Sequence, residues 1–219
     1  MTVNGNNQAT SYITVCSEAS DEIVIQKSRF IGYVRPCTSE EEAVQFIRTI
    51  REMHREARHC CYAYIIGINS GIIRYSDDGE PGGTAGLPIL NVLKNEQIVN
   101  CCVVVVRYFG GVLLGTGGLS RAYSQGCKIA LEAAGLVQME LSSEIRCTVS
   151  YSLWNSVQYA LQKMNVRIRD VIYLENVEFL LDTRTKDFES SVRTLTDITD
   201  GKIVFGDAEE KYIAWDLPS

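Results

Sequence analysis

The sequence of 219 residues has only 4 prolines and no tract rich in serine, glutamine and proline. Extensive disorder is therefore not expected, because disordered segments are enriched in these residues. Long apolar runs are also missing, and the longest, Cys101 to Val106, is far too short to span a bilayer. No N-terminal segment joins a basic start to an apolar stretch, so we expect a cytoplasmic protein with no membrane partner.

Metal-binding and nucleophile–base patterns are lacking as well, although the chain has eight cysteines and two histidines. No C-x-x-C occurs, and the adjacent pairs at 60–61 and 101–102 lie in strand-like sequence, where neighbouring side chains point to opposite faces. We predict reduced, mostly buried thiols, with no metal and no cofactor. His59 precedes Cys60, but adjacency in sequence does not place a base against its nucleophile, so no catalytic residue is assigned.

Cationic residues are fewer than acidic ones, with 21 Lys/Arg against 27 Asp/Glu and a net charge of −6. Residues 1–138 carry 12 Lys/Arg and 13 Asp/Glu (net −1), whereas residues 139–219 carry 9 and 14 (net −5). This balance argues against a general polyanion binder. A local patch in the first part is the better candidate for a nucleic-acid contact, and the acidic second part would suit a protein partner.

The first part of the sequence predicts a mixed pattern of strands and helices. Short strands at 23–25 and 30–34 precede a helix that Ser39 and Glu42 begin as a capping box. The apolar residues expected along that helix are Ala43, Phe46, Ile47, Ile50, Met53 and Ala57. A hairpin (60–68 and 72–75), a helix capped by Thr84, a buried strand (99–107) and a helix ended by Gly135 follow.

The second part predicts the βαββαβ order of a ferredoxin-like domain. Strands are expected at 145–151, 166–174, 177–182 and from 202, with helices at 153–164 and 186–196. The resulting fold class is α+β with two domains, 1–138 and 139–219. The polar residues 1–12 are expected to fray.

Two glycine-rich segments, Ser76 to Gly86 and Arg107 to Tyr123, each lead into a predicted helix. The free N–H groups of a helix start attract anions, so these segments are a candidate phosphate or nucleic-acid site. Its candidate residues are Gly82, Gly83, Thr84, Arg107, Gly110, Gly111, Gly115, Gly117, Gly118 and Arg121. Neither segment is a nucleotide-binding fingerprint, since Thr116 stands where a P-loop has lysine. Alternatively, the glycines only permit tight turns and close packing.

Two clusters of charge accompany these loops. Asp77, Asp78 and Glu80 could bind Mg²⁺ through their carboxylates, or could instead bond to nearby backbone as turn residues. Four arginines recur within roughly an 80° stripe of a helix that turns by about 100° per residue. They are Arg48, Arg51, Arg55 and Arg58. They could bind phosphates, or form a solvated face together with Glu52 and Glu56.

Four segments in order, Lys27–Phe30, Ala57–Cys60, Ser76–Gly86 and Val104–Tyr123, closely resemble the YigZ/IMPACT family. The resemblance implies a first domain similar to domain IV of elongation factor G, with a left-handed βαβ element, and a ferredoxin-like second domain. It also implies a place near translation. Eukaryotic members regulate translation initiation through the general-control kinase pathway, using an extra N-terminal domain for which no room is expected before Ile23.

The leading hypothesis is therefore a non-enzymatic, translation-associated regulator that contacts RNA or a ribosomal surface through its first domain. Two alternatives stay open. One is a nucleotide- or phosphate-ester-dependent enzyme that uses the glycine-rich loops with Asp77, Asp78 and Glu80. The other is a protein-interaction module whose acidic second domain meets a basic partner.

Overall fold

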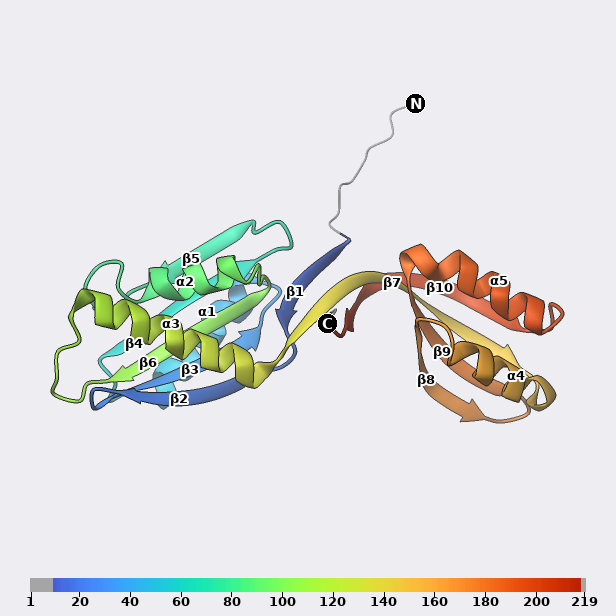
Figure 1. Cartoon of the computed structure of the whole chain (residues 1–219), viewed down its shortest axis with the longest axis horizontal. Helices are drawn as coiled ribbons and strands as arrows, with labels where there is room; N and C mark the ends of the chain where they lie inside the picture. The colour runs from blue at the N-terminus through green and yellow to red at the C-terminus, as the bar shows by residue number, and fades with distance from the viewer. Residues whose placement is uncertain (1–9, 218–219) are drawn as a thin grey trace, which may run out of the picture. The chain divides into compact units, whose positions relative to one another are not determined.

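The computed structural model describes residues 10–217, which form two units, each with its own internal contacts. The first unit runs to Gln138 and takes in Trp215, and the second comprises Met139–Ala214. Both units combine helices with antiparallel strands, so the chain has the predicted two-domain α+β fold (Figure 1). Among residues 10–217, no helix is both long enough and apolar enough to cross a bilayer.

The first unit is built on an antiparallel sheet with the order β2-β3-β6-β4-β5. Its strands are β2 (Ala19–Ile25), β3 (Ser28–Pro36), β4 (His59–Ile66), β5 (Ile72–Ser76) and β6 (Cys101–Tyr108). Gln26 and Lys27 join β2 to β3 with φ values of 45° and 66°, the conformation of a tight two-residue hairpin. The central strand β6 is buried from Cys101 to Arg107, which explains its continuous apolar run.

Helices cover both faces of this sheet. Helix α1 (Glu40–Met53) packs on one face, and α2 (Gly86–Asn95) and α3 (Gly115–Ala134) pack on the other (Figure 1). The adjacent cysteines divide between the two cores as predicted: Cys60 and Cys102 face α1, whereas Cys61 and Cys101 face α2 and α3. Strands β3 and β4 both pair antiparallel with β6, so β3–α1–β4 is a crossover. Its left-handedness stays a prediction.

Helix α1 starts as predicted but ends early. Ser39 Oγ accepts a hydrogen bond from the backbone N–H of Glu42 (3.2 Å), and the Glu42 carboxylate accepts one from the N–H of Thr38 (2.6 Å). The last helical residue is Met53, so the prediction of one helix that carries an arginine stripe through Arg55 and Arg58 is wrong.

The physical reason for the early end lies at His54, which caps the helix with φ −118° and ψ 48°. Its two ring nitrogens hydrogen-bond to the hydroxyl groups of Tyr33 (2.7 Å) and Tyr108 (2.9 Å). Because both tyrosines belong to the central sheet, the side chain is fixed against it. The chain then turns at 54–58 and enters β4.

The start of α2 also differs from the prediction. The N-cap is Ala85, which makes no side-chain cap bond, and the hydroxyl of Thr84 donates instead to the carbonyl of Pro81 (2.7 Å). The carboxylate of Asp77 accepts the N–H groups of Ala85 (3.0 Å) and Gly86 (2.8 Å). Thr84 is therefore not the cap, because Asp77, earlier in the same loop, already satisfies the helix start.

The second unit has the predicted order βαββαβ. Its elements are β7 (Leu136–Val149), α4 (Tyr151–Leu161), β8 (Val166–Tyr173), β9 (Val177–Arg184), a 3₁₀ turn (Thr185–Asp187), α5 (Phe188–Ile198) and β10 (Val204–Trp215). Strand β7 pairs with β9 and β10, and β8 pairs with β9, which gives the ferredoxin-like order β10-β7-β9-β8. Trp154, Phe179 and Leu195 lie in the core of this unit.

The chain start is partly more ordered than predicted. Residues 1–9 of the segment expected to fray lie outside the described residues, but Ser11 and Tyr12 belong to β1 (Ser11–Val15). The fraying prediction is wrong for these two residues. Strand β1 pairs with β7, the N–H of Val99 donates to the carbonyl of Ile13 (3.0 Å), and Thr14 Oγ1 donates to the carbonyl of Asn100 (3.1 Å).

Candidate functional site

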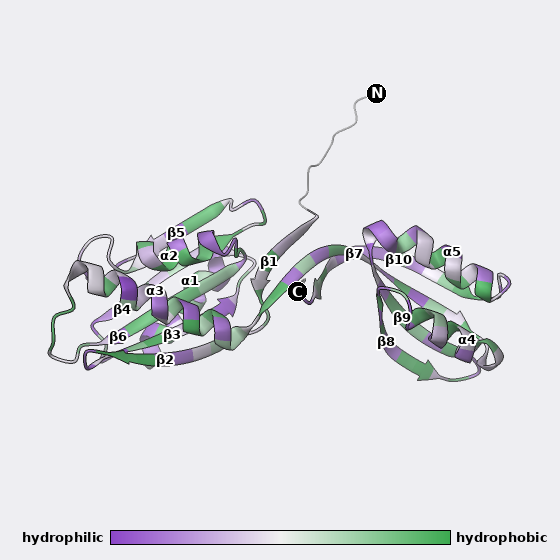
Figure 2. Cartoon of the chain, viewed as in Figure 1, coloured by the Kyte–Doolittle hydropathy of each residue, from purple (hydrophilic) through white to green (hydrophobic). Residues whose placement is uncertain are grey.

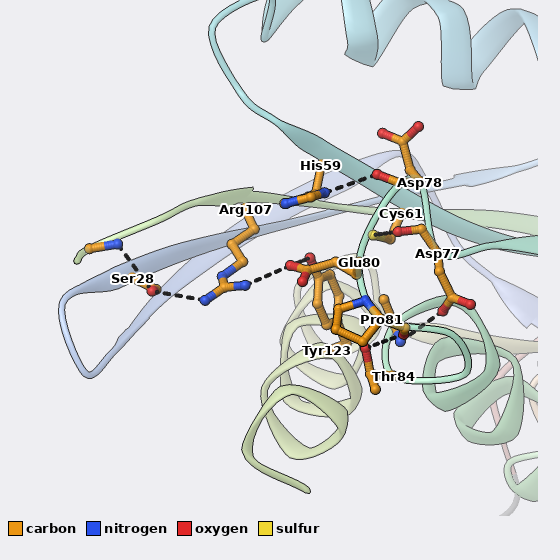
Figure 3. A network of polar contacts seen from close by, with 12 residues as sticks. Ser28, His59, Cys61, Asp77, Asp78, Glu80, Pro81, Thr84, Arg107 and Tyr123 are labelled. Carbon is orange, nitrogen blue, oxygen red and sulfur yellow. Dashed lines mark hydrogen bonds and ion pairs between the residues drawn. The ribbon is translucent and has the colours of Figure 1, made fainter. Parts of the chain in front are cut away.

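A buried ion pair anchors the first glycine-rich loop, 77–85, to strand β6, which leads into the second glycine-rich loop, 109–114 (Figure 3). Arg107 lies near the end of β6, and its Nη1 donates to Oε1 of Glu80 in the first loop at 2.7 Å. The exposed fractions of the two side chains are only 6% and 3%. Tyr123 of α3 donates its hydroxyl to the same oxygen at 2.8 Å. One carboxylate thus connects the first loop to β6 and to α3.

Arg107 makes further contacts that involve the second loop. Its guanidinium lies over the rings of Phe30 (5.5 Å) and Phe109 (5.3 Å). Its Nη2 donates to Oγ of Ser28 at 3.5 Å, and the same hydroxyl oxygen accepts the N–H of Gly110 at 3.2 Å. In residues 10–217 the buried Nε of Arg107 has no hydrogen-bond partner.

These contacts give Arg107 and Glu80 a positioning role, because neither side chain is exposed enough to bind a macromolecule directly. Removal of one partner of such a buried pair typically costs about 3–5 kcal/mol. The sequence held a signal for this pair. An arginine at the end of an otherwise apolar buried strand needs an internal partner, and Glu80 is the partner that the structure supplies.

Asp77 acts as the cap of α2. Besides Ala85 and Gly86, its carboxylate accepts the N–H of Gly83 at 2.8 Å. Burial alone would raise the pKa of Asp77, but these backbone donors outweigh it, so the pKa is lowered. The thiol of Cys61 donates to the Asp77 carbonyl oxygen at 2.9 Å and anchors the same residue from the sheet.

Asp78 has a separate set of partners. Its carboxylate accepts the N–H of Cys60 at 2.7 Å and a guanidinium N–H of Arg51 at 2.8 Å, while its carbonyl oxygen accepts a bond from His59 Nδ1 at 2.9 Å. Asp77, Asp78 and Glu80 are thus bonded to three different groups of protein donors. No His, Cys, Asp or Glu cluster suited to a metal ion occurs among the described residues. Asp77 bonds to nearby backbone, as the turn alternative describes, whereas the carboxylate of Asp78 bonds to Cys60 and Arg51, which precede the loop.

The candidate glycines of the two loops and of the first turn of α3 fall into three classes. Gly110 is required for packing, since a Cβ there would lie 2.0 Å from the backbone of Lys27, and Gly118 is close to Leu114. Gly83, Gly111 and Gly115 have positive φ values of 76°, 83° and 68°. Gly82 and Gly117 have neither property, because a Cβ at either position would meet nothing within 4 Å. Packing and turn geometry therefore explain only some of these glycines.

The second loop also exposes apolar side chains. Leu113 is 85% exposed, and Phe109 and Val112 are 49% and 38% exposed. Figure 2 shows this stretch before α3 as hydrophobic. An exposed apolar loop tip, next to glycines whose surface is open, is a common property of binding loops.

The outer face of α3 continues this surface with polar side chains. A shallow depression of about 370 Å³ is lined by Ser120, Arg121, Ser124, Gln125 and Lys128. The spacing of Arg121 and Lys128 places them on one side of the helix, two turns apart. Neither forms an ion pair with any described residue, and α3 carries no acidic residue before Glu132.

The four arginines of the expected stripe are not brought together on one helix. Arg48 and Arg51 lie on α1, whereas Arg55 and Arg58 lie in the turn that follows it. Arg51 is paired with Asp78. The structure instead shows Arg121 and Lys128 on α3, and the sequence contained their spacing, although Lys128 was not among the predicted site residues.

The sequence is similar to two known domain families and to several known proteins. Residues 26–131 match the Impact N-terminal domain, and residues 147–202 match a domain of unknown function, DUF1949. The IMPACT family member YvyE of Bacillus subtilis is 38% identical over 203 residues, which cover 93% of this chain and 94% of that protein. The family member YigZ of Escherichia coli is 46% identical over 109 residues, which cover 49% of this chain and 53% of that protein.

A eukaryotic protein and a solved structure are also similar. The IMPACT homolog of Saccharomyces cerevisiae is 34% identical over 101 residues, which cover 44% of this chain and 39% of that protein. A crystal structure described as that of a hypothetical protein has a TM-score of 0.59 at 30% identity and covers 93% of this chain and 100% of that chain.

Proposed function

The chain belongs to the IMPACT family, and from this premise we propose that it is a cytoplasmic, non-enzymatic regulator associated with translation. In this proposal it contacts RNA or a ribosomal surface through its first unit. The observation that carries the proposal is the outer face of α3, where Arg121 and Lys128 border a depression beside the glycine-rich loops. We call this surface, with the exposed loop 109–114, the α3 surface.

The α3 surface has the chemistry that a polyanion needs. Two cations that form no ion pair with residues 10–217 stand on one side of the helix, between hydroxyl and amide groups that can donate to phosphate oxygens. Helix α3 starts after Leu114 with no side-chain cap bond, so its first N–H groups and the positive end of its dipole are available to an anion. The open surface at Gly117 allows close approach of a backbone.

The apolar tip complements the cations. Val112 and Leu113 could pack on bases or sugars, or on an apolar patch of a ribosomal protein. A net charge of −1 for residues 1–138 is compatible with such a contact, because only a local patch must be positive.

The catalytic alternative has less support. It required Asp77, Asp78 and Glu80 to act together on a metal ion, but each carboxylate is bonded to a different set of protein donors. The two arginines beside them are each paired, Arg107 with Glu80 and Arg51 with Asp78.

A charge-removal experiment tests the proposal. The double variant Arg121→Gln with Lys128→Gln keeps helix propensity and removes both cations of the α3 surface. We expect weaker binding to a 20-nucleotide RNA and to purified ribosomes. The slope of log K against log salt should fall by about 1.4–1.8 if two phosphate contacts are lost.

A matched control is available on the opposite face of the sheet. The variant Arg48→Gln with Arg55→Gln removes the same charge from α1 and the turn after it, and we expect it to bind as the wild type does. Thermal unfolding of both variants confirms folding. If the α3 variant, properly folded, co-sedimented with ribosomes and bound RNA unchanged at every salt concentration, the proposal would be refuted. Loss of binding only in the control pair would assign the contact to α1.

A further inference from the structure

The second unit has two edge strands, and they differ in how they are protected. The sheet order β10-β7-β9-β8 leaves β10 and β8 at its edges. On β10 the exposed residues include Asp207, Glu209 and Glu210. Charged side chains on an edge strand discourage another strand from pairing with it. Strand β8 lacks this protection along its second half.

The second half of β8 and the turn after it form a continuous exposed apolar run. Val171, Ile172, Tyr173 and Leu174 are 36%, 42%, 58% and 64% exposed. Figure 2 shows the end of β8 as hydrophobic. Three consecutive exposed apolar residues at the end of an edge strand, followed by a fourth in the turn, are unusual in a protein that does not use them for association.

Neighbouring contacts hold this run in place. Tyr151 at the start of α4 stacks on Tyr173 with ring centroids 6.4 Å apart, and its hydroxyl donates to the carbonyl of Leu174 at 2.7 Å. Trp154 also contacts Tyr173 edge-to-face, with centroids 6.4 Å apart. These contacts order Tyr173 and Leu174 before a partner binds, so less conformational entropy is lost on binding.

A bulge separates this run from the first half of β8. The register with β9 shifts between Arg169 and Ile172, and Asp170 has a φ of 50°. A bulge of this kind redirects the strand that follows it. Pairing with β9 resumes at Ile172 and Tyr173, so the other side of the run is the edge of the sheet.

The charges around the run are acidic. Asp170 and Glu175 lie at its two ends, and neither forms an ion pair with a described residue. The arginines of β8 are engaged elsewhere: Arg169 pairs with Asp182 and Glu144, and Arg167 donates to the carbonyl of Ala214. With 9 Lys/Arg against 14 Asp/Glu in residues 139–219, the surroundings favour a cationic partner.

A second copy of the chain fits this edge poorly. Antiparallel pairing of two such runs about Ile172 and Tyr173 would place Asp170 of one copy opposite Glu175 of the other, and like charges in that position are unfavourable. We propose that the β8 edge, residues 170–175, binds a short, extended, basic segment of a partner protein as an added strand. Apolar side chains of the segment would pack on Val171–Leu174, and flanking Lys or Arg would pair with Asp170 and Glu175.

An array of random ten-residue peptides, probed with the full-length protein, tests this inference. We expect enrichment of peptides in which a short run of β-branched or aromatic residues is flanked by Lys or Arg. The best peptide should protect backbone amides of 170–175 from hydrogen exchange. The variant Ile172→Lys with Leu174→Lys should weaken its binding by about tenfold or more, through repulsion and a charged edge.

A matched control uses an exposed apolar residue of the other edge strand. Val204 on β10 is 63% exposed, so Val204→Lys, the match to the single variant Ile172→Lys, adds one lysine away from β8 and should leave peptide binding unchanged. Both variants change exposed residues, and circular dichroism confirms that they fold. No enrichment, enrichment of acidic or proline-rich peptides, or protection on β10 would overturn the inference. The inference would also be overturned if the protein formed a dimer that Ile172→Lys abolishes. Protection of the amides of 170–175 by RNA and not by peptide would overturn it as well.

Discussion

Removal of the carboxylate at Glu80 is expected to destabilise the first unit far more than the loss of any exposed ion pair. In Glu80→Ala, the guanidinium of Arg107 stays buried between the rings of Phe30 and Phe109 and keeps, among its hydrogen bonds to described residues, only the 3.5 Å bond to Ser28. The hydroxyl of Tyr123 loses Glu80 as its acceptor. Breakage of a buried pair typically costs about 3–5 kcal/mol, so the unfolding temperature should fall by about 6–20 °C at roughly 2–4 °C per kcal/mol.

Two further variants separate the stability contributed by the Tyr123 hydrogen bond from that contributed by an exposed ion pair. Tyr123→Phe removes one hydrogen bond to a charged group and should cost about 1.5–3 kcal/mol, since the ring keeps its packing against Phe30. Glu22→Ala removes the partner of Arg29, but this pair is exposed (51% and 48%), so the expected cost is about 0–1 kcal/mol. Glu22→Ala is the matched control, because it also removes a glutamate from an Arg–Glu ion pair, but from an exposed one.

Urea unfolding followed by far-ultraviolet circular dichroism, together with calorimetry, measures these differences. The double variant Glu80→Ala with Arg107→Met replaces the pair by apolar groups and should recover much of the lost stability, since no buried charge is then left unpaired. If Glu80→Ala cost less than about 1 kcal/mol, as the exposed control does, the reasoning about the buried pair would be refuted.

Three further predictions concern other groups. Because the pKa of Asp77 is lowered in the folded protein, its contribution is present above the ordinary aspartate pKa of about 3.9 and is lost as the pH falls through the lowered value. Asp77→Ala should therefore cost about 0.5–2 kcal/mol at pH 7 by urea unfolding, and a cost unchanged at pH 2 would contradict this. Burial, and then the charge of Arg29, lowers the pKa of His54, so the wild type should lose stability relative to His54→Gln as the pH falls below about 6.5; equal pH profiles would argue against it. Burial raises the pKa of the Cys60 thiol to about 11, and under native conditions Cys16 alone should react quickly with a thiol reagent; stoichiometric zinc, or several fast thiols, would contradict the packing role of the others.

Local sequence patterns predicted most of the fold because the signals were local. The capping pair at Ser39 and Glu42, the hairpin turns and Gly135 at the end of α3 all act within a few residues of the structure that they determine. The βαββαβ order of the second unit followed from strand and helix periodicity in the same way.

The failures share a different cause, which is contact between residues distant in sequence. Helical periodicity continued to Ala57, but His54 is bonded to Tyr33 and Tyr108, and this tertiary contact ends α1 at Met53. Thr84 had the residue type of a cap, yet Asp77 reaches the start of α2 through a loop. Neither partner could be paired from spacing alone.

In the candidate site too, local features were predicted and tertiary contacts were not. Spacing and residue type indicated the glycine-rich loops and Arg121, and the structure shows that α3 presents Arg121 beside Lys128. Arg107 and Glu80 are 27 residues apart, so the sequence suggested two surface-binding groups where the structure has a buried ion pair between the first loop and β6.

Hydrogen–deuterium exchange of the full-length protein, with and without purified ribosomes or a 20-nucleotide RNA, tests the central claim most directly. The proposed contact predicts that amides of loop 109–114 and of the first half of α3, through Lys128, exchange more slowly when the ligand is present, and that high salt reverses the effect. Residues 48–58 on the opposite face should exchange equally in both states. Protection confined to 48–58, or none in the first unit under conditions where binding is seen, would contradict the account.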